Sequence, residues 1–334
     1  ARLAYSSGRH ASIARPIIDG SLPDGSRVNL TFSSEVTKKG STFTIRKFRA
    51  DPLTITDLIS FGTISAEAAA YLWYLVEHKA SILIVGGVAT GKTTFLNCTA
   101  MFIRPEFKIV SIEDTPELNF PHENWIQAVS RTGFGVATGA AEVSLFDLLK
   151  ASLRQRPDFI IVGEIRGEEA YTLFQAVATG HGGLTTLHAD SVFSAISRLE
   201  NEPLNIPRPL IPNITALVLL NRVSLKEGPA RRIINCTELS GIDESSGRLL
   251  FDNTFRWDVG KDVILPMGPS PYIKKLAGLL GLNEKDVKAD LERRKVILEW
   301  MVKSNIRRYS EVSQVIREYY ADHEKLYLKA VVGV

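Results

Sequence analysis

Residues Gly86-Gly87-Val88-Ala89-Thr90-Gly91-Lys92-Thr93 form a complete G-x-x-x-x-G-K-T pattern, which is typical of phosphate-binding loops. The apolar run 81–85 before it indicates a buried strand, and residues 94–97 after it indicate the start of a helix. In a strand–loop–helix unit, glycines let backbone N–H groups surround phosphate oxygens, and the helix N-terminus adds a favourable dipole. The stretch therefore predicts a site for a nucleoside triphosphate, with ATP as the expected ligand.

The loop residues have distinct expected roles. Lys92 can reach the β- and γ-phosphates, and the hydroxyl of Thr93 can hold Mg²⁺. We expect nucleotide contacts from the whole loop and the residue that follows it: Gly86, Gly87, Val88, Ala89, Thr90, Gly91, Lys92, Thr93 and Thr94.

Outward from the loop, short apolar runs alternate with helical patterns. Runs at 108–112, 159–162, 183–187 and 216–220 suit strands that are buried on both faces. A helix is expected over 63–79, with Ser65 as its N-cap. This alternation predicts an α/β fold with a largely parallel sheet.

The flanking regions differ in pattern. Alternating strands at 26–32 and 42–48 predict that residues 1–50 are the end of a small α+β domain, joined by a linker or hinge at 51–62. A core domain is expected over 63–260, with a hairpin near its end. Residues 261–334 read as helices, in which one apolar stripe indicates a packing face: Leu291, Val296, Ile297, Trp300 and Met301.

Length, net charge and cysteine content narrow the classes of protein to which this chain could belong. With 334 residues the chain is long enough for two domains, and a net charge of +3 does not by itself indicate nucleic-acid binding. Neither a signal-peptide pattern nor an apolar run of about 20 residues is found in the sequence, and the start without Met suggests a piece of a longer protein. The two cysteines, Cys98 and Cys236, form no C-x-x-C pair, which argues against structural zinc and fits a reducing cytosol.

Acidic residues follow two of the expected strands. Glu164 ends the strand in 157–163, where a carboxylate could meet the metal held by Thr93. Glu113-Asp114-Thr115-Pro116-Glu117 follows the strand at 108–112. One of these carboxylates could orient or deprotonate the attacking water, and a solvated acidic turn is an equally good interpretation.

Histidines and arginines complete the candidate set. His181 and His188 flank the strand at 183–187 and fit a sensor of the γ-phosphate better than a zinc site. Arginines bracket the Glu164 strand and occur in the preceding domain, and one of them could stabilise charge across an interface. Each taken singly fits a surface position as well: Arg27, Arg46, Arg49, Arg154, Arg156 and Arg166.

The order of these blocks resembles one known family. After the phosphate loop come Ile-Glu-Asp-Thr-Pro-Glu (112–117), Leu-Arg-Gln-Arg-Pro-Asp-Phe-Ile-Ile-Val-Gly-Glu-Ile-Arg-Gly (153–167) and Ala-Thr-Gly-His-Gly-Gly-Leu-Thr-Thr-Leu-His-Ala-Asp (178–190). Over residues 15–240 the chain resembles the type II/IV secretion ATPases, in which these blocks are called Walker A, Asp box, Walker B and His box. The wording of these blocks along the sequence is similar to that of the archaeal branch of the family, which includes a GspE-like ATPase and the archaellum motor. The four-cysteine zinc module of bacterial type II members is absent from the sequence.

The resemblance implies a RecA-like P-loop core and specific residue roles. Glu117 matches the catalytic base, with Glu113 as its backup, and Glu164 matches the Walker B glutamate beside Mg²⁺. His181 and His188 match the His box. Nucleotide contacts from the N-terminal domain are expected at Arg27 and Arg46.

The implied function is Mg²⁺-dependent ATP hydrolysis by a cytoplasmic homo-hexamer that powers protein secretion or assembles a pilus-like or archaellum filament. An inner-membrane platform protein is the expected partner, and the motor itself would not insert into the membrane. Two alternatives stay open, a RecA-like nucleic-acid motor and a scaffold that binds ATP but barely hydrolyses it. No nucleic-acid partner is expected, and stimulation of the ATPase rate by single-stranded DNA would favour the first alternative.

Overall fold

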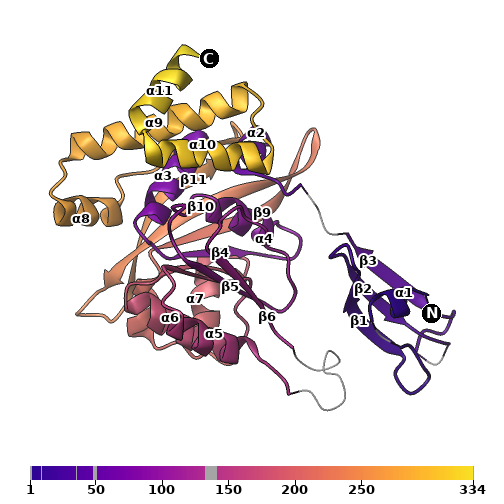
Figure 1. Ribbon diagram of the computed structural model, residues 1–334. Coiled ribbons are helices and arrows are strands. Elements are labelled where there is room, and N and C mark those ends of the chain that lie inside the picture. Colours follow the sequence, from indigo (N-terminus) through magenta and orange to yellow (C-terminus); the bar gives the residue numbers. More distant parts are fainter. Residues whose placement is uncertain (1, 9, 35, 48–50, 132–140, 334) are drawn as a thin grey trace.

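The computed structural model describes residues 2–8, 10–34, 36–47, 51–131 and 141–333. In this part of the chain, nine strands form one sheet in the order β12-β11-β10-β9-β4-β8-β7-β5-β6 (Figure 1). Neighbouring strands pair in parallel along β9, β4, β8, β7, β5 and β6, and they pair antiparallel along β9, β10, β11 and β12. Their bounds are β4 Ile82–Gly86, β5 Ile109–Glu113, β6 Trp125–Val129, β7 Phe159–Val162, β8 Gly182–His188, β9 Ala216–Leu225, β10 Gly228–Ile242, β11 Leu249–Asp258 and β12 Val263–Pro266. The predicted α/β class with a largely parallel sheet is confirmed.

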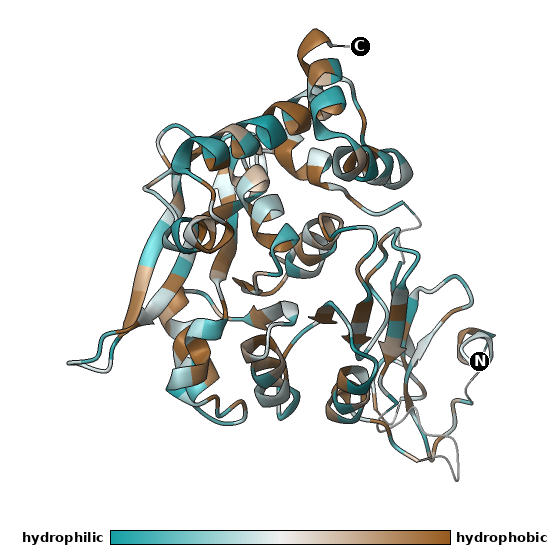
Figure 2. Cartoon of the chain, turned by 60° about the vertical axis from the view of Figure 1, so that its left-hand side comes forward, coloured by the Kyte–Doolittle hydropathy of each residue, from teal (hydrophilic) through white to brown (hydrophobic). Residues whose placement is uncertain are grey.

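Helices cover both faces of the sheet (Figure 2), so its central strands β4, β5, β7 and β8 are almost entirely buried. Along β4, Ile82 and Ile84 enter one core, while Leu83 and Val85 enter the other. The first core lies under α3 (Ala66–Glu77), α4 (Lys92–Ala100) and the C-terminal helices, and the second lies under α5 (Leu145–Arg154), α6 (Glu169–Ala178) and α7 (Val192–Glu200). The 3₁₀ helix η2 (Arg208–Asn213) also borders the second core. Helix α3 begins at the predicted N-cap, where the Ser65 hydroxyl accepts a hydrogen bond from the Ala68 N–H at 3.2 Å.

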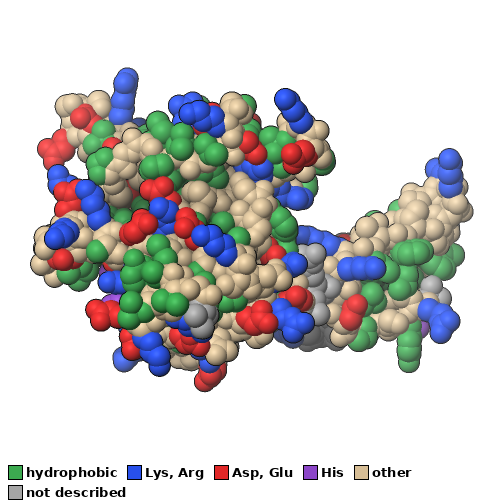
Figure 3. All heavy atoms as spheres, turned by 90° about the horizontal axis from the view of Figure 1, so that it is seen from above, with side chains coloured by type: hydrophobic (Ala, Val, Ile, Leu, Met, Phe, Trp, Pro, Cys, Tyr) green, Lys and Arg blue, Asp and Glu red, His purple; other side chains and the backbone are tan. Residues whose placement is uncertain are grey.

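A small antiparallel sheet precedes the main body and projects from its side (Figure 3). It contains β1 (Ile17–Ser21), β2 (Arg27–Thr31) and β3 (Thr42–Arg46), with the short helix α1 (Arg2–Ser6) beside it. The predicted strands are β2 and β3, whereas β1 was not expected; Phe48 and Arg49 lie outside the described residues. Its core is small, with Ala4, Ile18 and Leu30 buried together.

The segment expected to be a linker at 51–62 contains a packed helix, α2 (Ile55–Ser60). Ile55 and Leu58 are buried in the first core. Asp57 accepts a hydrogen bond from the Thr54 N–H at 3.0 Å and pairs with Arg307 at 2.9 Å, which ties α2 to the C-terminal region. Apolar burial therefore makes this half of the expected linker part of the main body.

The C-terminal region is helical, as predicted, but begins later, because β12 extends the sheet beyond residue 260. Its helices are α8 (Pro271–Leu280), α9 (Glu284–Lys303), α10 (Tyr309–Ala321) and α11 (His323–Val332). The α9 stripe packs on the first core as expected, with Ile297, Trp300 and Met301 buried there. Among the described helices, none has the length and apolar character needed to span a bilayer.

Candidate active site

The phosphate loop joins β4 to α4 at the carboxyl edge of the parallel strands. Gly86 is required by space, because a Cβ there would lie 2.6 Å from the Leu220 carbonyl oxygen and 2.6 Å from Thr90 Oγ1. Gly91 has φ of 93°, a conformation that L side chains rarely adopt, and it directly precedes α4. The Thr90 hydroxyl donates to the Gly87 carbonyl at 3.0 Å and closes the loop on itself.

Lys92 points back across this loop. Its Nζ donates to the Gly87 carbonyl at 2.8 Å and lies 3.2 Å from Nδ1 of His188. The residue is 7% exposed, and burial lowers the pKa of its ammonium group. The ammonium is thus held at the loop by weak neutral partners, which a phosphate oxygen can replace with a charge-assisted bond.

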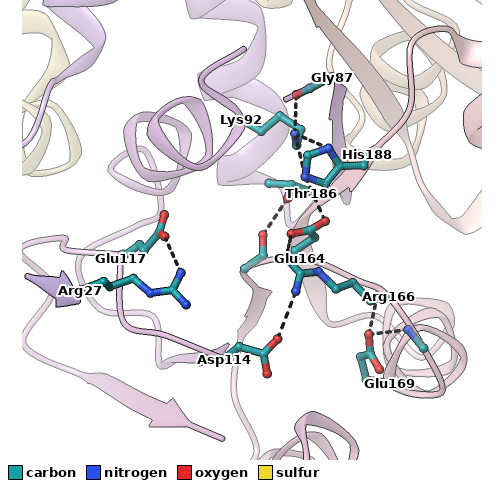
Figure 4. A network of polar contacts seen from close by, with 12 residues as sticks. Arg27, Gly87, Lys92, Asp114, Glu117, Glu164, Arg166, Glu169, Thr186 and His188 are labelled. Carbon is teal, nitrogen blue, oxygen red and sulfur yellow. Dashed lines mark hydrogen bonds and ion pairs between the residues drawn. The ribbon is translucent and has the colours of Figure 1, made fainter. Parts of the chain in front are cut away.

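Glu164 is the centre of a polar network at the ends of β7 and β8 (Figure 4). One carboxylate oxygen lies 3.3 Å from His188 Nε2, and the other accepts a hydrogen bond from Arg166 at 2.5 Å. Arg166 also lies 3.8 Å from Asp114, which follows β5. Burial and the nearby Lys92 ammonium lower the pKa of His188, which favours its neutral form at pH 7.

Glu117 follows β5 and faces the N-terminal sheet. Arg46 binds its two carboxylate oxygens at 2.7 and 3.1 Å, and Arg27 lies 3.7 Å away. Glu113 differs, because it is only 3% exposed and accepts hydrogen bonds from the backbone N–H groups of Glu117 and Leu118 at 2.8 and 3.0 Å. Burial raises the pKa of Glu113, so the two glutamates of this turn occupy very different environments.

A cavity of about 770 Å³ brings these residues together. Its lining includes residues 88–94 of the loop and the start of α4, both Glu117 and Glu164, and His188, but not Gly86 or Gly87. Basic side chains outnumber the two lining carboxylates: Arg27, Arg46, Lys92, Arg166, Arg231 and Arg232. Such an excess of positive charge around a loop of backbone N–H groups suits a polyanion.

His181 lies at the opposite end of β8 from His188. Seven residue steps along an extended strand separate the two positions, or about 23 Å at 3.3 Å per residue, and only His188 belongs to the cavity lining. The His181 ring contacts the Ala176 carbonyl at 3.0 Å, at the C-terminus of α6. The structure therefore does not bring His181 to the site within one chain, because a strand directs its two ends to opposite edges of the sheet.

Other arginines divide between the cavity and the surface. The cavity lining includes neither Arg154 nor Arg156, the predicted residues before β7. Sequence reasoning missed Arg231 and Arg232 on β10. Arg231 donates to the Ala89 carbonyl of the phosphate loop at 3.2 Å, and Arg232 is buried against Asp262 at 2.7 Å. No motif marks them, since their position depends on the pairing of β10 with β9 beside β4.

A divalent cation fits the oxygen ligands of this cavity. The Thr93 hydroxyl and the Glu164 carboxylate both line it, and hard oxygen ligands together with phosphate and water are what Mg²⁺ prefers. Thr93 follows the loop lysine at the start of α4, so its hydroxyl lies at the helix N-terminus where phosphates bind.

Comparison with known proteins gives one consistent result. Residues 7–225 match the model of a family described as type II/IV secretion system protein. The chain is 42% identical over 317 residues to the uncharacterized protein MJ0900 of Methanocaldococcus jannaschii, which covers 94% of this chain but 57% of that protein. A second protein of that organism, MJ1287, is 44% identical over 80% of this chain and 98% of its own length.

The chain is also similar, at lower identity, to bacterial proteins. The type IV secretion system protein PtlH of Bordetella pertussis is 30% identical over 260 residues, covering 68% of this chain and 76% of that protein. The crystal structure of the Yersinia pseudotuberculosis ATPase DotB superposes with a TM-score of 0.51 over 95% of this chain and 81% of that chain, at 16% identity. That last likeness is one of fold.

Proposed function

The chain belongs to the type II/IV secretion system protein family, and from this premise we propose that it binds ATP with Mg²⁺ and hydrolyses it to drive a secretion or filament machine. One observation carries the proposal. Lys92 of the phosphate loop, Glu164 and Glu117 come from three separate strand ends and line one strongly basic cavity. Ligands of open α/β sheets lie at this edge, beyond the carboxyl ends of the strands.

In the proposed complex the triphosphate lies along the loop between β4 and α4. Backbone N–H groups and the α4 dipole hold the phosphates, and Lys92 moves from the Gly87 carbonyl to the β/γ-oxygens. Thr93 and Glu164 would hold Mg²⁺, which neutralises charge on the phosphates when bound. The apolar part of the cavity, formed in part by Phe61, Leu220 and Pro229, would then hold the adenine ring of the nucleotide.

Hydrolysis then needs a group that accepts the proton of water. Water oxygen attacks the γ-phosphorus, the bond to the β–γ bridging oxygen breaks, ADP leaves and Glu117 takes the proton. Arg27 and Arg46 contact Glu117 in the structure. In the reaction they would release the carboxylate and stabilise the negative charge that develops on the transferred phosphoryl.

The same proposal extends to assembly and partners. We infer a cytoplasmic homo-hexamer that acts on a membrane platform protein and carries no nucleic acid. The archaeal relatives favour an archaeal secretion or pilus-like system, with the archaellum as one member of that class. Purification of the native ring, followed by identification of the integral membrane protein that stays bound to it in mild detergent, tests this part. Recovery of a nucleic acid in place of such a protein would contradict it.

Two substitutions test the chemistry. Lys92→Ala removes the phosphate contact, so both binding of a fluorescent ATP analogue and phosphate release should fall sharply. Glu164→Gln keeps the shape but not the charge, so binding should persist while turnover falls by about 10²-fold or more. Lys150→Ala is the matched control, because Lys150 is an exposed lysine of α5 that contacts the Phe146 ring outside the cavity. Turnover in Lys92→Ala equal to that of the control would overturn the proposal.

A further inference from the structure

The turn that carries Glu117 is built around a buried carboxylate. Glu113 is the last residue of β5, and one of its oxygens accepts the N–H groups of both Glu117 and Leu118. Its other oxygen accepts a hydrogen bond from Nε2 of Gln127 on β6 at 3.2 Å. Glu113 thus replaces the backbone carbonyls that would otherwise close such a turn.

Burial of this carboxylate argues for a specific role. A charged side chain that is 3% exposed is costly unless donors compensate it, and here two backbone donors and one side-chain amide do so. Of the described residues that line the cavity, Glu117 is one and Glu113 is not. With both carboxylate oxygens bound to these donors and its side chain outside the cavity lining, Glu113 is not placed to act as a second base.

Gln127 holds the turn from the neighbouring strand. Its amide donates to Glu113 and also lies 3.4 Å from the Leu118 carbonyl. Leu118 is buried in the first core, 2% exposed, so the turn is fixed just beyond Glu117 as well. The backbone of Glu117 is thereby held on both sides, while its carboxylate stays in the cavity.

We propose that Glu113 is a positioning residue that acts on hydrolysis only through Glu117, by holding the Glu117 backbone where its carboxylate reaches the attacking water. The inference rests on the proposed function. It replaces the expected role of Glu113 as a substitute base with a geometric one. Because Glu113 does not line the cavity, its replacement should change kcat and leave nucleotide affinity unchanged.

A double-mutant cycle on the full chain tests this. Glu117→Gln should lower kcat by about 10²–10⁴-fold, the usual contribution of a general base. Glu113→Gln should lower kcat by about 10- to 100-fold, the cost of a small misplacement of a reacting group. The Kd of a fluorescent ATP analogue should stay within about twofold of wild type in both variants. In the Glu117→Gln background, adding Glu113→Gln should have no further effect on kcat.

The outcomes separate the two proposals. Wild-type kcat in Glu117→Gln would refute the base and with it the mechanism proposed above. An inactive Glu117→Gln with an unaffected Glu113→Gln, or effects of the two substitutions that multiply in the double variant, would overturn the positioning role alone. Glu123→Gln, an exposed glutamate beyond the same turn, is the control. If Glu113→Gln fails to fold, Gln127→Leu decides instead: a drop in kcat without a change in Kd supports the role, and unchanged kcat refutes it.

Discussion

Replacement of Gly86 by alanine tests how the phosphate loop is built. A methyl group at this position would meet the Leu220 carbonyl oxygen at 2.6 Å and Thr90 Oγ1 at 2.6 Å. The first atom is backbone of β9, which pairs with β4 at this very residue, so it cannot rotate away. The second belongs to the hydroxyl that closes the loop on Gly87. Both strand pairing and loop closure must therefore shift.

The magnitude follows from this overpacking. Insertion of one methyl group into a filled site costs about 1–3 kcal/mol, which lowers the unfolding temperature of Gly86→Ala by several degrees. If the same 1–3 kcal/mol opposes the loop geometry that binds phosphate, affinity for a fluorescent ATP analogue should fall by roughly 5- to 150-fold, since 1.4 kcal/mol corresponds to a factor of ten. Thermal unfolding and a binding titration measure the two effects.

Gly87→Ala is the matched control for that substitution. The nearest atom to its added methyl would be Thr90 Cγ2 at 3.9 Å, an ordinary van der Waals contact. We expect an unfolding temperature close to wild type. Equal unfolding temperatures for the two alanine variants would refute the packing argument.

Two further predictions concern side chains of the cavity. Arg46→Ala should lower kcat by about 10²–10³-fold, as loss of one donor to a transition-state charge does. The kcat of Arg46→Lys should lie between that of Arg46→Ala and that of wild type, because lysine lacks the bidentate fork. Lys38→Ala, which changes an exposed lysine, is the control, and an Arg46→Ala variant as active as this control would contradict the role. His188→Gln should make the stability of the fold less sensitive to acid. Burial and the Lys92 ammonium lower the pKa of His188 from its usual 6.5, so the folded chain protonates this imidazole less readily than the unfolded chain does. Stability is therefore lost as pH falls below 6.5. The difference in unfolding temperature between wild type and His188→Gln, measured from pH 7.5 to 5, should change with pH, and a constant difference would rule the explanation out.

The sequence predicted the parts of the fold that depend on local pattern. Apolar β-branched runs identified β4, β5, β7, β8 and β9, because strands buried on both faces need them. Strand β6 was missed, since it forms the edge of the sheet and is mostly exposed, which removes the apolar signal. Helix α2 was missed because its burial depends on distant C-terminal helices.

The sequence also indicated those residues of the candidate site that lie next to the ends of the predicted strands. Lys92, Glu117 and Glu164 follow strands, and His188 ends one; the carboxyl ends of these strands meet at one edge, so motif and topology together bring the four residues close. His181 belongs to the same block of sequence but lies before its strand, which takes it to the far edge. Arg231 approaches the loop only through tertiary pairing, which sequence spacing does not reveal.

A crystal structure of the full chain with a non-hydrolysable ATP analogue and Mg²⁺ would show whether the cavity holds the nucleotide as proposed. We predict that the triphosphate lies on the loop after β4, with Lys92 at the β/γ-oxygens, the metal between Thr93 and Glu164, and the Glu117 carboxylate facing a water in line with the γ-phosphorus. A triphosphate bound away from this loop, or a Glu117 carboxylate that stays paired with Arg46 and turned from the γ-phosphate, would contradict the account.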